Sequence, residues 1–219
     1  ACFDEIDHEF LLEIIPLDKR MLKQWLKCGF MEGRSKRIFP TKAGTPQGGI
    51  ISPTLANMVL DGLEERINKA LPRRGNRINF VRYADDFIVT AKEKWMLTDV
   101  IRPLIEDFLK PRGLQLSEEK TLITNIDNGF DFLSQNMRKF NGKLITQPTK
   151  NAVKRQAEKL RSIIKDHNGK STEQLIRRLN PVISGWANFH RYVQSSTAFG
   201  KLDTVLYESL MRWCKRRHN

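Results

Sequence analysis

Apolar and polar residues follow two different patterns along this chain. The stretch from Ile78 to Thr90 reads I-N-F-V-R-Y-A-D-D-F-I-V-T, with β-branched and aromatic residues on both sides of a short centre. Two such runs around a tight turn are typical of a β-hairpin. The pattern therefore predicts a hairpin that presents two adjacent carboxylates, Asp85 and Asp86, at its tip.

Helical spacing of apolar residues dominates the rest of the sequence. It predicts helices over 8–15, from a cap at Asp18 to Cys28, over 53–71 with Ser52 as the cap, and over 94–110. A Gly-Arg-Ser turn between apolar ends predicts a hairpin over 30–41. From about residue 147 only helical spacing is found, over 151–166, 172–184 and 199–217, which predicts three helices with lysine and arginine on their outer faces.

The charge is concentrated near the C-terminus. The 219 residues carry a net charge of +13, and 40% of them are hydrophobic, enough for the core of one large domain or two small ones. Residues 141–219 hold 16 Lys and Arg against 5 Asp and Glu, whereas residues 1–140 hold 22 against 20. Such a basic module suits a polyanionic partner, most simply nucleic acid; the alternative is the solvated face of an ordinary helical domain.

Cysteine usage and hydropathy narrow the protein class. Cys2, Cys28 and Cys214 are widely spaced and stand at no zinc-ligand spacing with histidine, which indicates a reducing compartment and no zinc site. The sequence has no apolar run of about 18 residues and opens with no signal peptide. We therefore expect a soluble intracellular protein that has no membrane partner.

The Asp85-Asp86 pair admits two interpretations. Aspartate is a common turn residue because its side chain bonds nearby backbone and tolerates unusual backbone angles. Apolar flanks, however, make uncompensated charge costly, and a cluster of carboxylate oxygens is what hard divalent cations such as Mg²⁺ prefer.

Several strings together resemble one family. Tyr83-Ala84-Asp85-Asp86 resembles the metal-binding hairpin of reverse transcriptases, and T-P-Q-G-G-I-I-S-P-T-L-A-N at 45–57 resembles their motif that contains P-Q-G. G-F-D-F-L-S-Q-N-M-R at 129–138 is similar to the G-F-x-F-L-G strand that closes the palm, with Ser134 in place of the usual glycine. The stretches 179–190 and 210–218 resemble the thumb, or maturase-specific, domain of group II intron proteins. The chain is thus similar to group II intron-encoded reverse transcriptases and maturases.

This resemblance implies an α+β fold in two domains. Residues 1–146 would form a polymerase palm, an antiparallel sheet packed on helices, and 147–219 a three-helix basic thumb bundle. The family's first motif, similar to D-I-K-A-C-F-D, is matched only in its last four residues at the start of the chain. We therefore expect the fingers and the first metal-binding Asp upstream of Ala1, and a fragment that is inactive alone. Asp4 and Asp7 are interpreted as helix caps, not as replacements for that Asp.

The implied activity is RNA-directed DNA synthesis, in which a primer 3′-hydroxyl attacks the α-phosphate of a deoxynucleotide on an RNA template. Two Mg²⁺ ions, with Mn²⁺ as the alternative, would be held by Asp85 as principal and Asp86 as supporting ligand. Phe3 would be the steric gate against the sugar 2′-hydroxyl, and Gln47 and Gly48 would contact the incoming nucleotide and template. Lys120 would assist the leaving pyrophosphate. Phe3 as a core residue and Lys120 as a solvated lysine remain the alternatives.

The implied partners are intron RNA, a DNA primer or target, and deoxynucleotides, in a bacterial cytoplasm or an organelle. The candidate RNA-binding residues are basic side chains interleaved with aromatic ones: Arg191, Arg212, Lys215, Arg216 and Arg217. The neighbouring rings of Trp186, Phe189, Tyr192 and Trp213 either pack in the core or face RNA. A hypothesis from a different class is an RNA-binding splicing maturase without polymerase activity.

Overall fold

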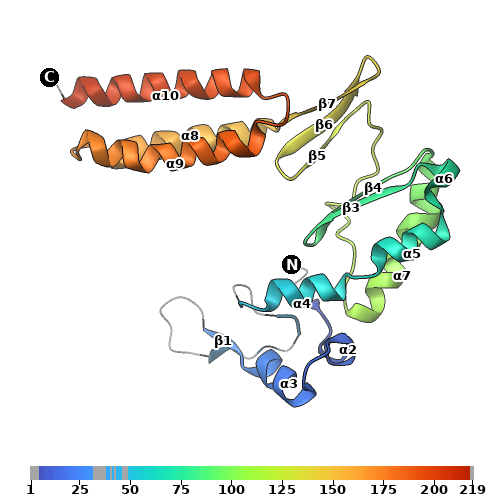
Figure 1. Cartoon of the computed structure of the whole chain (residues 1–219). Coiled ribbons are helices and arrows are strands. Elements are labelled where there is room, and N and C mark those ends of the chain that lie inside the picture. Colours follow the sequence, from blue (N-terminus) through green and yellow to red (C-terminus); the bar gives the residue numbers. More distant parts are fainter. Residues whose placement is uncertain (1–4, 32–37, 40, 42, 46–48, 218–219) are drawn as a thin grey trace. The chain divides into compact units, whose positions relative to one another are not determined.

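The computed structural model describes residues 5–31, 38–39, 41, 43–45 and 49–217 (Figure 1). Helices and small antiparallel sheets are mixed along the chain, which confirms the predicted α+β class. The chain divides into two compact units, Ala1–Ile123 and Thr124–Asn219, and each has its own hydrophobic core. The palm and thumb boundary at residue 146 stays a prediction, because a division by packing does not test a division by function.

Capped helices open the N-terminal unit where the apolar spacing predicted them. α2 spans His8–Ile14 and α3 spans Lys19–Lys27. The carboxylates of Asp7 and Asp18 each accept a hydrogen bond from the backbone N–H three residues further on, at 2.8 and 2.9 Å. Asp7 is therefore a helix cap, as predicted, whereas Asp4 lies outside the described residues.

The predicted hairpin and long helix that follow differ in outcome. β1 (Phe30–Met31) and β2 (Ile38–Phe39) pair antiparallel, as predicted. The single helix predicted over 53–71 is wrong: α4 spans Ser52–Val59, with Ile51 rather than Ser52 at the N-cap position, and α5 spans Leu63–Ala70. Gly62 separates them with a φ of 83°, a left-handed conformation that glycine adopts freely. The apolar face nevertheless continues across the break, because its members remain buried: Leu55, Val59, Leu63 and Ile67.

A two-stranded antiparallel hairpin follows the short turn α6 (Arg73–Asn76). β3 spans Asn79–Tyr83 and β4 spans Asp86–Thr90, which confirms the hairpin predicted over 78–90. Phe80 and Phe87 lie on the face that packs against the core, with ring centroids 5.8 Å apart. One face of the hairpin is thus anchored on helices, and the other remains available.

The helix predicted over 94–110 is irregular. A π-helical segment, η1 (Met96–Ile101), leads into α7 (Arg102–Leu109) and a single 3₁₀ turn, η2 (Lys110–Arg112). Pro103 explains the irregularity, since proline lacks an N–H and its ring clashes with the carbonyl four residues earlier in a regular α-helix. Widening the preceding turn relieves that clash without ending the helix.

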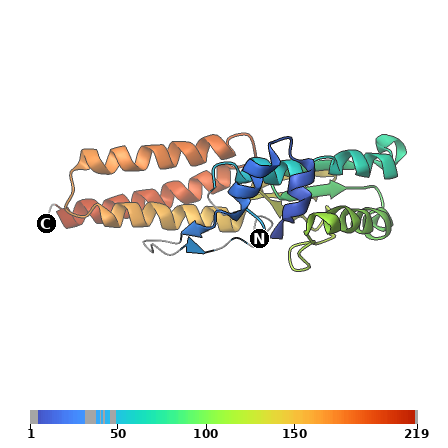
Figure 2. The same cartoon turned by 90° about the horizontal axis from the view of Figure 1, so that it is seen from below.

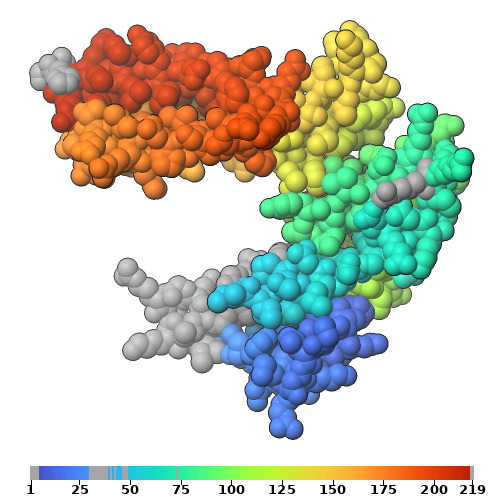
Figure 3. Space-filling model, viewed as in Figure 1, coloured from blue at the N-terminus to red at the C-terminus, as the bar shows by residue number. Residues whose placement is uncertain are grey.

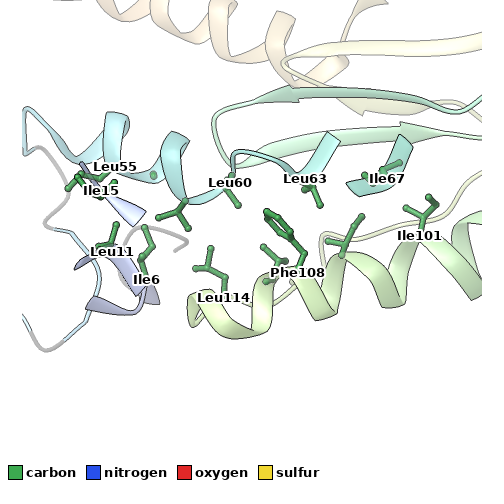
Figure 4. Packing of buried hydrophobic residues seen from close by; sticks show 14 of the residues in the cluster. Ile6, Leu11, Ile15, Leu55, Leu60, Leu63, Ile67, Ile101, Phe108 and Leu114 are labelled. Atoms are coloured by element: carbon green, nitrogen blue, oxygen red, sulfur yellow. The ribbon is translucent and has the colours of Figure 1, made fainter. Parts of the chain in front are cut away.

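Arg112 joins the separate helices of the N-terminal unit. Its guanidinium lies over the rings of Phe10 and Phe108, at 4.6 and 3.4 Å, and donates hydrogen bonds to the carbonyls of Val59 and Phe108. Burial, and next the charge of Arg66, lower the pKa of Arg112. Figure 4 shows the apolar core of this unit; its labelled members include Ile6, Leu11, Leu63, Phe108 and Leu114.

The C-terminal unit begins with a three-stranded antiparallel sheet. β5 spans Phe130–Phe132, β6 spans Gln135–Phe140 and β7 spans Lys143–Pro148. The strand predicted from the G-F-x-F-L-G resemblance is therefore two strands. Leu133 and Ser134, with φ of 48° and 66°, form the tight turn between them. The position where the family has glycine is a left-handed one, which explains why glycine suits it.

Three long helices complete the C-terminal unit and lie alongside one another in both Figure 1 and Figure 2. α8 spans Lys150–Asp166, α9 spans Thr172–His190 and α10 spans Ser196–Arg217. α9 runs six residues beyond its predicted end at 184, and α10 begins three residues before its predicted start at 199. The side chains of these helices pack closely along their length (Figure 3) around a shared core that includes Leu160, Leu175, Leu202 and Trp213.

Candidate active site and nucleic-acid interface

The hairpin tip presents the two predicted carboxylates. Asp86 is the first residue of β4 and pairs with Tyr83, while Asp85 and Ala84 form the connecting turn. Ala84 has a φ of 53°, an uncommon conformation for a residue other than glycine, aspartate or asparagine. Both carboxylates are exposed at the tip, and Phe87, Ile88 and Val89, which follow them in β4, are half-buried.

The available face of the hairpin is partly apolar. Residues directly opposite one another in an antiparallel pair share a face, so Asp86 shares its face with Tyr83, and Val81 shares that face with Ile88. Tyr83 and Val81 are both exposed. Asp86 therefore stands at the edge of an open surface on which a ligand with flat apolar groups can lie.

Arg82 fastens the hairpin tip to α4. Its Nη1 donates a hydrogen bond of 2.9 Å to Oδ1 of Asn57 in α4 and one of 3.0 Å to the carbonyl of Ala84, the residue directly before Asp85. Asn57 is the last residue of the string that resembles the P-Q-G motif. Two strings that the sequence shows separately are thus physically joined, through a residue that the sequence did not single out.

The donor chemistry of the tip suits a hard divalent cation, but the described residues supply only part of a site. The side chains of Asp85 and Asp86 make no hydrogen bond or ion pair with the described part of the chain, which leaves both carboxylates available. Among these residues no group of three or more His, Cys, Asp or Glu side chains comes together. The pair fits Mg²⁺ in donor type but supplies two carboxylates alone within the described part of the chain.

Three predicted site residues, Phe3, Gln47 and Gly48, lie outside the described residues, although their neighbours in sequence are described. The backbone N–H of Gly44 donates to the carbonyl of Ile6 at 2.8 Å, and the carbonyl of Gly44 lies 2.7 Å from Nε2 of His8. The segments that follow Phe3 and precede Gln47 are therefore bonded to each other.

Gly113 approaches the same N-terminal segment. A Cβ at this position would lie 2.8 Å from the carbonyl oxygen of Glu5 and 3.0 Å from the backbone nitrogen of Asp7. The turn after α7 thus packs directly on the residues that follow Phe3.

Lys120 is exposed in a turn closed by hydrogen bonds from Lys120 and Thr121 to the Ser117 carbonyl. Its neighbour Glu118 accepts two hydrogen bonds from Arg102, at 2.6 and 2.8 Å. The described contacts of Lys120 do not include Asp85 or Asp86, so its predicted role rests on the family resemblance alone.

The predicted RNA-binding residues fall into two groups in the C-terminal unit. Arg212, Lys215, Arg216 and Arg217 lie in the last turns of α10, whereas Arg191 directly follows α9 and precedes the start of α10. α10 has 22 residues, which corresponds to about 33 Å at the α-helical rise. The prediction placed these residues in one group, but Arg191 lies near the start of α10 and the other four lie at its end.

Burial separates the four aromatic candidates. Trp213 is buried, and its indole N–H donates to the carbonyl of His167; Trp186 is partly buried and packs on the helical core. These two confirm the interpretation as packing residues. Phe189 and Tyr192 are exposed, which leaves the alternative open for them.

Two protein-family models match separate parts of this chain. Residues 1–137 match the model described as reverse transcriptase (RNA-dependent DNA polymerase), and residues 153–219 match the group II intron, maturase-specific domain.

Similar curated proteins include the group II intron-encoded protein LtrA of Lactococcus lactis subsp. cremoris, 29% identical over 63% of this chain and 33% of that protein. An uncharacterized 91 kDa protein in the cob intron of Schizosaccharomyces pombe is 26% identical over 94% of this chain and 35% of that protein. Protein YkfC of Escherichia coli K12 is 27% identical over 62% of this chain and 44% of that protein. The chain thus spans about a third to less than half of these relatives. Within its described part, none of its helices combines the length and the apolar character needed to cross a bilayer.

Proposed function

Because this chain belongs to the group II intron reverse transcriptase and maturase family, we propose that it forms part of an RNA-directed DNA polymerase that also binds its intron RNA. The observation that carries this proposal is the exposed Asp85-Asp86 tip, held to α4 by Arg82. The proposed compartment is a bacterial cytoplasm or an organelle.

In the proposed reaction a primer 3′-hydroxyl attacks the α-phosphate of a deoxynucleotide and pyrophosphate leaves. Asp85 would be the principal and Asp86 the supporting ligand of two Mg²⁺ ions, with Mn²⁺ as the alternative, and a carboxylate of the family's first motif would complete the site. When bound, such ions neutralise charge on the attacking and leaving oxygens. Arg82 holds the tip in position, and the available face with Tyr83 and Val81 suits the flat bases of a primer end.

The remaining predicted site residues keep their proposed roles. Phe3 would exclude the 2′-hydroxyl of a ribonucleotide, and Gln47 and Gly48 would contact the nucleotide and template. The bond between Gly44 and Ile6 supports this grouping, because it joins the two segments that carry these residues. Lys120 is proposed to assist the departure of pyrophosphate.

Primer extension on an RNA template tests the polymerase proposal. The assay uses a polypeptide that carries the family's complete first motif together with residues 1–219. We expect Asp85→Asn to reduce extension by more than about a hundredfold. Replacing a residue that only contacts a metal ligand typically costs about ten- to a hundredfold, so a larger loss indicates a ligand itself. Asp107→Asn, which changes an exposed carboxylate of α7 that has no partner in the described part of the chain, should extend normally.

The second candidate, a splicing maturase without polymerase activity, is favoured by the concentration of positive charge in residues 141–219. Binding to structured intron RNA, measured by electrophoretic mobility, separates the two. Tight RNA binding without extension by the complete polypeptide would leave the maturase role and remove the polymerase role. Extension that Asp85→Asn leaves unaffected would instead overturn the proposed role of Asp85.

A further inference from the structure

Two aromatic rings are exposed at the corner between α9 and α10, which comprises residues 189–195, although their exposure does not stabilise the helical bundle. Phe189, in the last turn of α9, is 53% exposed, and Tyr192, in the connection to α10, is 80% exposed. Aromatic side chains provide large, flat contact areas, and tyrosine adds a polar hydroxyl, which is why tyrosine is enriched at interfaces.

A row of rings fixes the position of Phe189. The Phe199 ring meets the Trp186 ring at 5.5 Å, edge to face, and Trp186 lies 4.3 Å from the His190 ring. His190, which is 1% exposed, meets Phe189 at 4.7 Å with their planes perpendicular. The inner rings are packed, so the outermost one is held at the surface with little freedom left to lose on binding.

The connection that carries Tyr192 is equally well anchored. The hydroxyl of Ser195 donates to the carbonyl of His190 at 2.9 Å, and the backbone N–H of Val193 donates to the same carbonyl at 3.3 Å. The N–H of Gln194 donates to the carbonyl of Thr146 in β7 at 2.9 Å. These three hydrogen bonds hold the connection that carries Tyr192 against the end of α9 and against β7.

Arg191 supplies a cation at the same place. Its guanidinium carbon lies 4.6 Å from the centre of the Tyr192 ring, and its Nη2 donates to the Tyr192 hydroxyl at 2.6 Å. No carboxylate in the described part of the chain pairs with Arg191. Between Glu173 and Asp203 the sequence contains no acidic residue and four basic ones: Arg177, Arg178, Arg191 and Lys201.

We infer that Phe189, Arg191 and Tyr192 form a stacking site for unpaired bases of a bound RNA strand. The inference rests on the proposed function of RNA binding and adds to it a named site and a named state of the RNA. Exposed aromatic rings bind bases through their faces, and a nearby cation attracts the phosphates. Bases inside an A-form duplex are already stacked and beyond the reach of such rings, so the site selects single-stranded segments, loops or bulges over paired ones.

The experiment measures binding of the full 219-residue chain to a fluorescently labelled, adenine-rich single-stranded RNA, and to a blunt RNA duplex of matched length. We expect Tyr192→Ala to weaken single-strand binding by about 5- to 150-fold, the range for loss of one stacked base, and to change duplex binding little. Tyr192→Phe keeps the ring and should restore most of the affinity, while Tyr192→Leu, apolar but without a π face, should not.

Two further variants make the test specific. Tyr207→Ala removes a tyrosine on α10 that is 65% exposed and stands beside Glu208, outside the basic stretch, and it should leave both affinities unchanged. Phe189→Leu should weaken single-strand binding in the same direction as Tyr192→Ala. Thermal unfolding of each variant confirms that the helices remain folded.

The outcomes separate this inference from the proposed function. If the chain binds RNA but Tyr192→Ala binds the single strand as tightly as the wild type, or if Tyr207→Ala has the same effect, the stacking site is overturned while RNA binding stands. If the wild-type chain binds neither RNA, both fail. If Tyr192→Ala leaves RNA binding unchanged but abolishes self-association in sedimentation, the surface is a protein interface and the inference is wrong.

Discussion

At the scale of single residues, several residues other than glycine have a backbone conformation that glycine would adopt more easily. Outside glycine, positive φ values are found among the described residues at Arg77, Ala84, Leu133, Ser134 and Asn141. Four of these positions, Ala84, Leu133, Ser134 and Asn141, are in the tight turns that connect β3 to β4, β5 to β6 and β6 to β7. Each L-residue held in this conformation costs about 1 kcal/mol relative to glycine.

Ser134→Gly tests this cost directly. With a φ of 66° at the second turn position, we expect the change to stabilise the C-terminal unit by about 0.5–1 kcal/mol, measured as the free energy of unfolding in urea. Ser184→Gly is the matched control, because Ser184 is exposed within α9, where the same exchange should destabilise by about 0.5 kcal/mol. Equal effects of one sign at both positions would show that the turn conformation is not the cause.

Arg82 and Asn57 carry a second prediction at this scale. We expect Arg82→Met and Asn57→Ala each to destabilise the N-terminal unit, with a coupling energy of about 0.5–1.5 kcal/mol in a double-mutant cycle, because each removes the same 2.9 Å hydrogen bond. Lys92→Met, at the other end of the hairpin and without a side-chain partner in the described part of the chain, is the control. Additive effects, with no coupling, would mean that the bond does not fasten the tip.

At the scale of elements, tertiary contacts decide where helices end. α9 passes through Pro181 and Gly185 and continues to His190, because Trp186 and His190 pack against neighbouring rings and the helical core. α4 and α5, by contrast, separate at Gly62 although the apolar face would allow one helix. Helix propensity is a weak effect. In α9, burial of the side chains outweighs the low helix propensity of Pro181 and Gly185, whereas between α4 and α5 the left-handed conformation of Gly62 ends the first helix.

The end of α9 predicts a pH dependence. Burial lowers the pKa of His190, so between the folded pKa and the ordinary value near 6.5 the unfolded chain binds more protons than the folded one. The free energy of unfolding of the C-terminal unit should therefore be fully present above about pH 6.5 and fall on acidification, by about 1.4 kcal/mol for each unit of pKa depression.

Urea unfolding measured from about pH 7.5 down to about pH 5 checks this, with His190→Gln for comparison. That variant is less stable near neutrality because it disturbs a buried ring, and it should lose most of the pH dependence seen in this range. A wild-type stability that stays constant or rises on acidification would contradict the assignment.

At the scale of the whole molecule, charge is the property that distinguishes the two parts. Residues 141–219 carry 16 basic against 5 acidic residues, and the one ion pair among the described residues of this segment joins Arg177 to Glu173. Most of its cations therefore keep their charge available to solvent, where phosphate can displace counterions.

RNA affinity should accordingly depend steeply on salt. If the five candidate residues each contact a phosphate of single-stranded RNA, the logarithm of the binding constant should fall with the logarithm of salt concentration with a slope of about −3.5. The double variant Lys215→Gln, Arg216→Gln should reduce the slope by about 1.4, whereas Lys69→Gln, paired with Glu65 in the N-terminal unit, should not change it. Slopes that are equal in all three proteins would exclude the end of α10 as a phosphate contact.

Much of the fold and part of the site could be predicted from local pattern. The caps at Asp7 and Asp18, the hairpin that carries Asp85 and Asp86, and the three C-terminal helices depend on neighbours in sequence, and the structure confirms them. The turn at Asn141-Gly142 was missed although Asn-Gly is a strong hairpin signal. Gly62 and Pro103 are likewise visible in the sequence as residues that interrupt α-helices. The apolar periodicity alone predicts continuous helices across both positions.

The sequence by itself determined the family, the order of elements and the uneven charge, because motifs, periodicity and composition are local properties of a chain. Only the tertiary structure decided that Arg82 joins the hairpin tip to Asn57, that the basic candidates divide between the two ends of α10, and that Trp213 packs while Tyr192 is exposed. Each depends on how residues far apart in sequence meet, and solvent exposure and long-range hydrogen bonds are set by packing, which no single segment specifies.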